Sequence, residues 1–310
     1  MNTYTVGVDV GGTNIKLGIV SSAGKIIAKT RLATKGFGSH KTQFIDALVA
    51  AIQKLLKKRN LSLRQVRGIG IGLPGLIDPR QGTIIQLPNI PGWKNVSLVK
   101  LLKKKLNVPI YIENDVNLIT LAEWKYGAGR GFTDLVCITL GTGVGGGLIF
   151  NNGLYRGSGF AAGEIGHMPI EKNGIACPCG GRGCFERYVG NAYLLQKIRK
   201  IFRRENMRIQ DVFILANRGN KQALMFWKEF GQTLGFGLTG VVNLLNPQAI
   251  VIGGGVSNNF KFFAPAVRDV LKKRCMKVQG KMAKILRARF SHDAGILGAH
   301  VLVKETKFGS

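Results

Sequence analysis

Acidic residues are scarce in this sequence. Its 310 residues include 16 Asp and Glu against 45 Lys and Arg, which gives a formal net charge of +29. Such an excess ordinarily favours binding to nucleic acid, membrane surfaces or other polyanions. The cations are spread along the chain, however, and the dense run 196–208 separates them with apolar residues at helical spacing. A solvated helix face accounts for this run, so we expect non-specific polyanion binding but no specific nucleic-acid function.

Long hydrophobic runs are also missing, and cysteines are few, with only Cys137 and Cys275 isolated from the others. No apolar run approaches the roughly 20 residues that a membrane span requires, and the first residues lead into a predicted strand rather than a signal peptide. Three of the five cysteines lie in one short segment, which fits a reducing compartment better than a disulfide framework. These absences predict a cytoplasmic protein with no membrane partner.

The length and the hydrophobic pattern predict an α/β protein of two domains. A chain of 310 residues exceeds the size at which a single core usually stops growing. Residues 3–34 have the pattern of three short strands joined by glycine turns, and a helix at 42–58 and a strand at 66–71 follow. The same order begins again with strands at 135–140 and 147–150. This repetition indicates two related domains that face a cleft.

A short segment concentrates metal-ligating side chains. It carries one imidazole and three thiols, from His167, Cys177, Cys179 and Cys184. These donors suit zinc, and four of them leave no open position, which describes a structural site. Free or disulfide-bonded cysteines are the alternative, but the two thiols of Cys-x-Cys are too close in sequence for an easy mutual disulfide. The segment therefore predicts a structural Zn²⁺ site beside two flanking carboxylates, Glu164 and Glu186.

Three glycine-rich segments have the composition of phosphate-binding turns. Their candidate nucleotide ligands are Asp9, Gly11, Gly12, Thr13 and Asn14 in the first, Thr142 and Gly143 in the second, and Gly253, Gly254 and Gly255 in the third. Glycines let the backbone approach a ligand closely, and a carboxylate at a strand end can hold a hydrated Mg²⁺. Each segment alone could be only a tight turn, whereas the three together favour a nucleotide.

Asn114 and Asp115 follow the predicted strand 109–113, where α/β sheets place their reactive groups. The carboxylate of Asp115 could accept a proton from an attacking hydroxyl. The alternative is a helix N-cap, because the following residues are helical and Asp is a favoured cap. The sequence pattern leaves both interpretations open at this position.

The motifs together resemble those of the ROK family of sugar kinases and related repressors, within the actin and hexokinase superfamily. The matching segments, in the order of the family, are DVGGTN, GLPGLID, PNIPGW, END, LGTGVGGG, GEIGH, CPCGGRGCFE and VIGGGV. The resemblance extends from Val6 to about His300. The spacing of the His and Cys residues in the zinc segment is its most specific part.

The resemblance implies a fold, a domain division and roles for individual residues. It implies two ribonuclease-H-like domains, with residues 1–117 and 297–310 in a small domain and 118–296 in a larger one that carries the zinc loop. Asp115 is then the general base. Sugar ligands are Gly75, Asn89, Asn114, Asp115, Glu164, His167 and Glu186, with His167 also on zinc.

The resemblance also implies a reaction, which is ATP-dependent and Mg²⁺-dependent phosphorylation of a hexose by a homodimeric enzyme. The PNIPGW segment is closest to the glucokinase branch, so glucose is the expected substrate and fructose, mannose or an N-acetylhexosamine are alternatives. The family is usually less basic, which leaves polyphosphate open as a donor. A sugar-sensing regulator is the non-enzyme alternative; the first glycine turn lies so close to Met1 that no DNA-binding domain is expected before it.

Overall fold

The computed structural model describes residues 4–34, 40–87, 92–290 and 292–305. The chain divides into two compact units. Unit 1 comprises Met1–Tyr126, Leu154–Ala162 and His292–Ser310, and unit 2 comprises Gly127–Gly153 and Gly163–Ser291. The first boundary thus follows residue 126 rather than the expected residue 117, and a short excursion from the second half of the chain belongs to unit 1.

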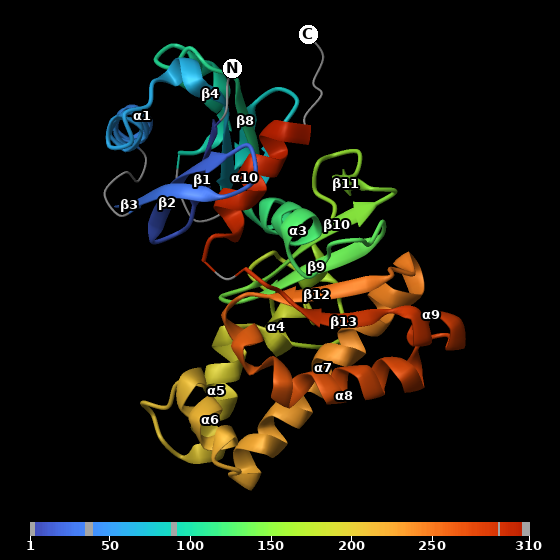
Figure 1. Ribbon diagram of the computed structural model, residues 1–310. Coiled ribbons are helices and arrows are strands. Elements are labelled where there is room, and N and C mark those ends of the chain that lie inside the picture. Colours follow the sequence, from blue (N-terminus) through green and yellow to red (C-terminus); the bar gives the residue numbers. More distant parts are fainter. Residues whose placement is uncertain (1–3, 35–39, 88–91, 291, 306–310) are drawn as a thin grey trace. The chain divides into compact units, whose positions relative to one another are not determined.

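Unit 1 is built on a five-stranded sheet with the order β3-β2-β1-β4-β8 (Figure 1). The strands are β1 (Tyr4–Val10), β2 (Asn14–Ser21), β3 (Ile26–Ala33), β4 (Val66–Leu73) and β8 (Ile110–Asn114). The first three form an antiparallel meander, while β4 runs parallel to β1 and β8 parallel to β4. Because β1, β4 and β8 are parallel, their carboxyl ends meet at one edge of the sheet.

Four helices complete this unit: α1 (Lys41–Lys57), α2 (Leu98–Lys103), α3 (Asp115–Tyr126) and α10 (Ala294–Glu305). Helix α10 packs beside α3 and against β1 and β4 (Figure 1). All its residues from Ala294 to Val303 are buried. The apolar pattern predicts a helix over 98–106, whereas α2 ends at Lys103.

A second, three-stranded antiparallel sheet was not predicted from the sequence. It consists of β5 (Leu76–Asp78), β6 (Thr83–Gln86) and β7 (Lys94–Val96). The turn before β6 is held by the Asp78 side chain, whose Oδ1 accepts hydrogen bonds from the backbone N–H groups of Arg80 and Gln81. The Asx turn begins at the Asp of an Asp-Pro pair, a combination that predicts a turn from the sequence.

Unit 2 repeats the plan of unit 1 with a five-stranded sheet of order β11-β10-β9-β12-β13. The strands are β9 (Leu135–Leu140), β10 (Val144–Phe150), β11 (Gly153–Tyr155), β12 (Ala249–Gly253) and β13 (Lys284–Arg287). Strands β9 and β10 are antiparallel, and β9, β12 and β13 are parallel. The predicted α/β architecture with two related halves is therefore confirmed.

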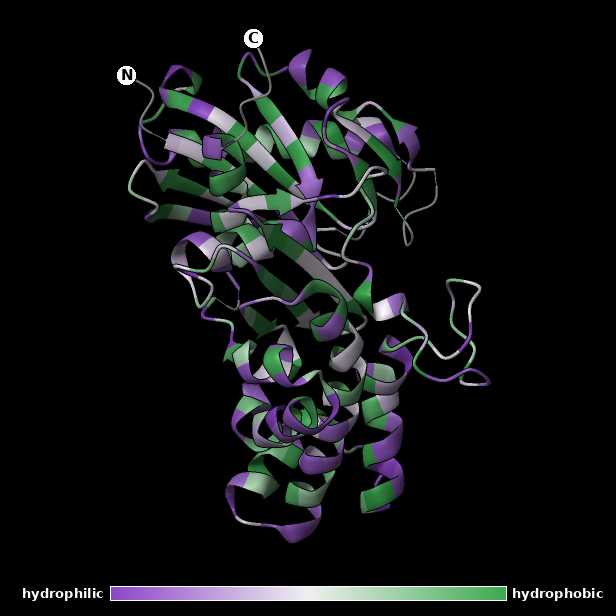
Figure 2. Cartoon of the chain, turned by 90° about the vertical axis from the view of Figure 1, so that its right-hand side faces the viewer, coloured by the Kyte–Doolittle hydropathy of each residue, from purple (hydrophilic) through white to green (hydrophobic). Residues whose placement is uncertain are grey.

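The helices of unit 2 are α4 (Glu186–Val189), α5 (Asn191–Phe202), α6 (Ile209–Asn217), α7 (Lys221–Leu245), α8 (Phe260–Arg274) and α9 (Lys277–Met282). Figure 2 shows hydrophilic stripes along them, in contrast to the largely apolar strands. In α5, Leu194 and Ile198 are buried while Arg199 and Lys200 are exposed, as the amphipathic pattern predicts. None of the helices in the described part of the chain combines the length and hydropathy that a bilayer span requires.

Candidate functional site

The first group of predicted residues lies at the carboxyl edge of the sheet in unit 1. The register pairs Asp9 of β1 with Gly72 of β4, and Leu73 of β4 with Asn114 of β8. Asp9 and Asn114 therefore end two strands of one sheet that are separated only by β4. We call Asp9, the turn 11–14, Gly75, Asn114 and Asp115 the first half-site.

The structure assigns the N-cap of α3 to Asn114. Its Oδ1 accepts hydrogen bonds from the backbone N–H groups of Val116 (2.9 Å) and Asn117 (3.2 Å). Its Nδ2 donates to the carbonyl oxygen of Gly75 at 3.1 Å, where the chain turns with φ of +94°. One side chain thus caps the helix and fixes the loop that follows β4.

Asp115 is the first residue of α3 and therefore not its N-cap, which was one of the two interpretations that the sequence allowed. Its carboxylate is half-buried, and its Oδ1 accepts a hydrogen bond from the backbone N–H of Val116 at 2.9 Å. The N-terminus of a helix stabilises negative charge, which favours an ionised carboxylate at this position. An ionised, partly accessible carboxylate has the chemistry of a proton acceptor.

A buried ion pair at Glu113, two residues before Asp115, was missed by the sequence analysis. Glu113, with a side chain only 3% exposed, accepts a hydrogen bond from Nε of Arg156 at 2.6 Å. The other oxygen of Glu113 accepts from the backbone N–H of Asn114 and from Nδ2 of Asn117. The two partners are 43 residues apart, and no local pattern in the sequence links them.

The first glycine turn is a tight hairpin between β1 and β2. The N–H of Gly11 donates to the carbonyl oxygen of Asn14, and Thr34 Oγ1 donates to the carbonyl oxygen of Gly11 at 2.7 Å. Gly12, Thr13 and Asn14 are exposed, as a ligand-binding turn requires. Asp9 lies behind the turn with Nζ of Lys16 at 3.3 Å from its carboxylate. A single carboxylate in this position suits a Mg²⁺ that keeps most of its own waters.

In unit 2 the predicted sugar ligands lie on an irregular segment packed against β10. Gly163 has φ of +96°, and a Cβ there would approach the carbonyl oxygen of Gly146 to 2.6 Å. Glycine is therefore required where this segment meets the strand. Glu164 precedes a short 3-10 helix, Ile165–His167, which ends at His167, and both residues are exposed. Nε2 of His167 lies 3.9 Å from the Glu164 carboxylate.

The four predicted metal ligands converge. One ligand atom from each of His167, Cys177, Cys179 and Cys184 lies within 4.8 Å of every other. Cys179 Sγ is 3.6 Å from Cys184 Sγ, and Cys177 Sγ is 3.8 Å from His167 Nδ1. Zinc bonds of about 2.0–2.3 Å in a tetrahedron place neighbouring ligand atoms roughly 3.3–3.8 Å apart. The donor set and its spacing therefore fit Zn²⁺, with Nδ1 as the imidazole ligand.

The three thiols differ in acidity. Burial raises the pKa of the Cys177 thiol to about 12 and also raises that of Cys184. The backbone N–H of Gly181 lowers the pKa of Cys179, the exposed member. His167 ends the 3-10 helix Ile165–His167, and the three cysteines lie on the loop 177–184, where isolated backbone bridges join Pro169 to Cys184 and Ala176 to Arg182. The cluster thus forms with little regular structure around it.

Glu186 connects the metal cluster to the second glycine turn. One carboxylate oxygen accepts from the backbone N–H of Val144 at 3.3 Å, and the other lies 3.8 Å from His167 Nδ1 and 3.4 Å from Cys177 Sγ. The exposed residue Thr142 and its neighbour Gly143 form the turn itself. We call Thr142, Gly143, Glu164, His167, Glu186 and the loop 253–255 the second half-site.

The third glycine segment belongs to the second half-site through its contact with β9. Gly254 has φ of +80°, and a Cβ there would lie 2.3 Å from the carbonyl oxygen of Leu140. Gly253 is the last residue of β12, while Gly254 and Gly255 are exposed. The loop therefore presents open backbone beside the end of the strand that leads into the second turn.

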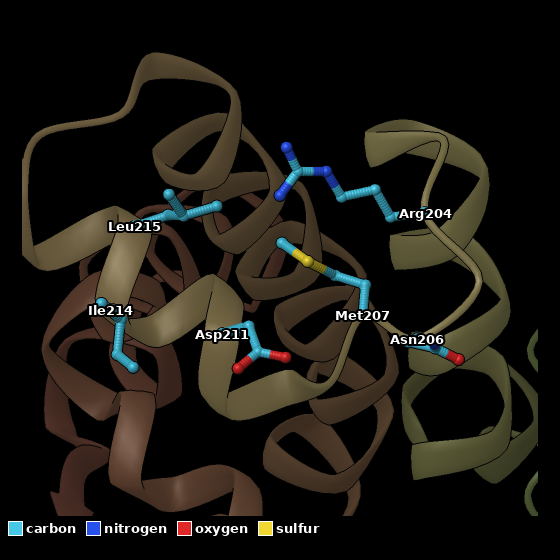
Figure 3. A pocket seen from close by; sticks show the side chains of 6 residues that line it. All are labelled: Arg204, Asn206, Met207, Asp211, Ile214 and Leu215. Carbon is cyan, nitrogen blue, oxygen red and sulfur yellow. The ribbon is translucent and has the colours of Figure 1, made fainter.

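Two observations fall outside these half-sites. Asn89 lies outside the described residues, so its predicted role has no structural counterpart here. A pocket of about 390 Å³ in unit 2 contains none of the predicted site residues (Figure 3). Its lining residues are Arg204, Asn206, Met207, Asp211, Ile214 and Leu215.

Comparison with known proteins assigns the chain to a family. Residues 5–306 match the ROK family. A glucokinase of Thermotoga maritima is 31% identical over 97% of each chain. A xylose repressor of Bacillus subtilis is also 31% identical, over 97% of this chain and 77% of the repressor.

Comparison with solved structures points to the same family. The crystal structure of a ROK family glucokinase from Streptomyces griseus, in complex with glucose and AMPPNP, matches with a TM-score of 0.80 and 29% identity. The match covers 98% of this chain and 100% of that one. The expected resemblance is confirmed: the chain belongs to the ROK family.

Proposed function

We propose that this protein is an ATP-dependent hexose kinase that converts glucose to glucose 6-phosphate. The observation that carries the proposal is the position of Asp115, a half-buried carboxylate at the N-terminus of α3 whose capping role has been taken by Asn114. The glucokinase relatives and the structure with glucose and AMPPNP support the same reaction class.

In the proposed mechanism Asp115 accepts the proton of the sugar 6-hydroxyl as that oxygen attacks the γ-phosphoryl group of ATP. Asn114 has one amide hydrogen left for a sugar hydroxyl, because its other contacts are made to Gly75 and to the start of α3. Exposed backbone of the turns 11–14 and 141–143 would bind phosphate oxygens. Asp9 would hold a hydrated Mg²⁺ that arrives with ATP, and this ion would supply positive charge to offset the negative charge of the phosphates.

The second half-site supplies sugar recognition in this proposal. Zinc on Nδ1 of His167 would leave Nε2 as an N–H donor, since a neutral imidazole carries one proton. The Nε2 N–H would then donate to the oxygen of one sugar hydroxyl, while the carboxylates of Glu164 and Glu186 would accept from other hydroxyl groups. The zinc itself has a structural role, because its four ligands leave no position for substrate.

A coupled assay over a panel of sugars and donors tests the proposal. Glucose, fructose, mannose and N-acetylglucosamine should each be offered with ATP and with polyphosphate, and glucose with ATP should give the highest kcat/KM. A protein that phosphorylates none of these sugars under any pairing would contradict the kinase assignment. Sedimentation in the same buffer tests the homodimer that we propose for the active form.

A sugar-responsive regulator is the second candidate. The observation that favours it is the 31% identity to a xylose repressor, a level equal to that of the glucokinase. Calorimetry separates the two candidates, because a regulator would bind a sugar tightly without turning it over. Xylose belongs in that titration for this reason.

A further inference from the structure

The most basic segment of the chain forms a pocket that the proposed kinase reaction does not use. Residues 261–290 contain ten Lys or Arg and a single acidic residue, Asp269. They form α8, α9 and β13 of unit 2. Between these elements lies a pocket of about 510 Å³, and four cations line it: Arg268, Lys272, Lys281 and Lys284.

In the part of the chain that the structure describes, no carboxylate pairs with the cations of this pocket. Asp269, the acidic residue of this segment, is paired with Lys273 at 2.9 Å. The four cations are all exposed, so their mutual repulsion is relieved only by solvent ions or by a bound anion.

Arg268 is fixed in orientation despite its exposure. Its Nη2 donates to the carbonyl oxygen of Ile285 at 2.9 Å, and its guanidinium lies 5.6 Å from the centre of the Phe260 ring. The backbone contact and the aromatic contact order the side chain before any ligand arrives. The remaining N–H groups of the guanidinium can then serve a phosphate with little further loss of rotamer entropy.

The pocket is separate from the second half-site. Lys284 begins β13 and pairs with Ala249, the first residue of β12, whereas the loop 253–255 follows the other end of β12. A rise of about 3.3 Å per residue puts roughly 13 Å of strand between the two positions. An anion in the pocket would therefore occupy a different place from a nucleotide on the glycine loop.

We propose that this pocket binds a soluble anion made of linked phosphate groups. Four cations with no acidic partner favour a ligand with several charges, and the volume exceeds what one phosphate fills. Lysine ammonium groups pair with phosphate as point charges, while the fixed Arg268 offers a fork that matches two oxygens. The apolar floor, from Leu271, Ile285 and Leu286, gives the ligand no further polar group to satisfy.

Calorimetric titration with sodium tripolyphosphate tests the proposal in buffer of physiological ionic strength. The double variant Lys272→Gln/Lys281→Gln should weaken binding at this site by about 10-fold or more, since it removes two of the four cations that would pair with the phosphates. The matched control, Lys200→Gln/Lys228→Gln, removes the same charge from exposed positions of the same unit and should leave the affinity unchanged.

Hydrogen exchange then locates the ligand. Tripolyphosphate should slow exchange in peptides covering 268–286, whether or not the protein proves to be a kinase. Equal loss of affinity in both double variants, or protection confined to the glycine turns, would overturn the proposal. So would preferential binding to vesicles of phosphatidylglycerol and phosphatidylcholine that is lost on Val278→Ser, because the exposed Val278 and Met282 beside the pocket suit a membrane surface.

Discussion

In unit 1 the first half-site lies at the ends of regular elements, whereas in unit 2 the predicted sugar ligands lie on or beside a long, mostly irregular segment between β11 and α4. Asp115 is placed by the junction of β8 and α3, and a cap, a loop contact and a buried ion pair surround that junction. Glu164, His167 and Glu186 depend instead on the convergence of the metal cluster. The comparison indicates that a position on a strand end needs only hydrogen bonds, while a loop of this length needs a cross-link to hold several side chains at once.

The largest expected effect tests the first half-site. Asp115→Asn should lower kcat by about 100- to 10,000-fold, because the amide cannot accept the proton, while sugar affinity changes little. A coupled assay and calorimetry measure the two quantities. Asp46→Asn is the matched control, since Asp46 is exposed and pairs only with Lys105 in the described structure. A variant that keeps more than about a tenth of the kcat would remove Asp115 from the mechanism.

The next largest effect is expected from the ion pair between Glu113 and Arg156. Arg156→Ala leaves the Glu113 carboxylate buried without its cation, and we expect a loss of about 3 kcal/mol in the free energy of unfolding. Urea denaturation measures it. Arg156→Lys should recover part of the loss by restoring the charge without the planar fork. If both variants unfold like the parent, hydrogen bonds alone hold this junction.

Metal removal tests the second half-site. The purified protein should contain about one zinc per chain, and Cys179→Ser should lower the zinc content and weaken sugar binding by roughly 10- to 100-fold. Elemental analysis and calorimetry measure these quantities. Cys275→Ser, at a cysteine outside the cluster, serves as the control. Metal-free protein that binds sugar with full affinity would show that the loop holds its shape without a cross-link.

The last expected effect is spread over a range of pH and concerns the core of unit 1. Burial, with Lys304 and Arg67 adding repulsion, lowers the pKa of His300 to about 4. Its Nδ1 lies 2.7 Å from Thr5 Oγ1, and Nε2 has no hydrogen-bond partner among the described residues. Between pH 6.5 and 4 the unfolded chain binds a proton that the folded chain does not. The free energy of unfolding should therefore fall as pH drops, by at most about 1.4 kcal/mol per pH unit.

Denaturation of His300→Asn against the parent isolates this contribution. The variant should have a flatter dependence on pH over that range, because it lacks the group whose proton uptake favours unfolding. The exposed His292 provides the control, since His292→Asn should keep the slope of the parent. Parallel curves for all three proteins would place the pH dependence on other groups.

The sequence by itself predicted most of the main elements and the four candidate metal ligands. Strand 135–140 was predicted at its observed bounds, and the helix at 42–58 within one residue of α1, because apolar periodicity is a local property. The four ligands of the cluster could be identified because their chemistry and short spacing are both contained in one segment. The repeated order of hairpin and parallel strands followed from the same local patterns.

Only the tertiary structure decided how side chains of distant segments are used. The sequence left Asp115 open between cap and base, and the contacts of Asn114 with Gly75 and α3 assign the cap to the neighbouring residue. Arg156 reaches Glu113 from an excursion, Leu154–Ala162, that belongs to unit 1 although it follows the first strands of unit 2. Such contacts depend on where the backbone brings two segments together, and a propensity or spacing rule carries no information about that placement.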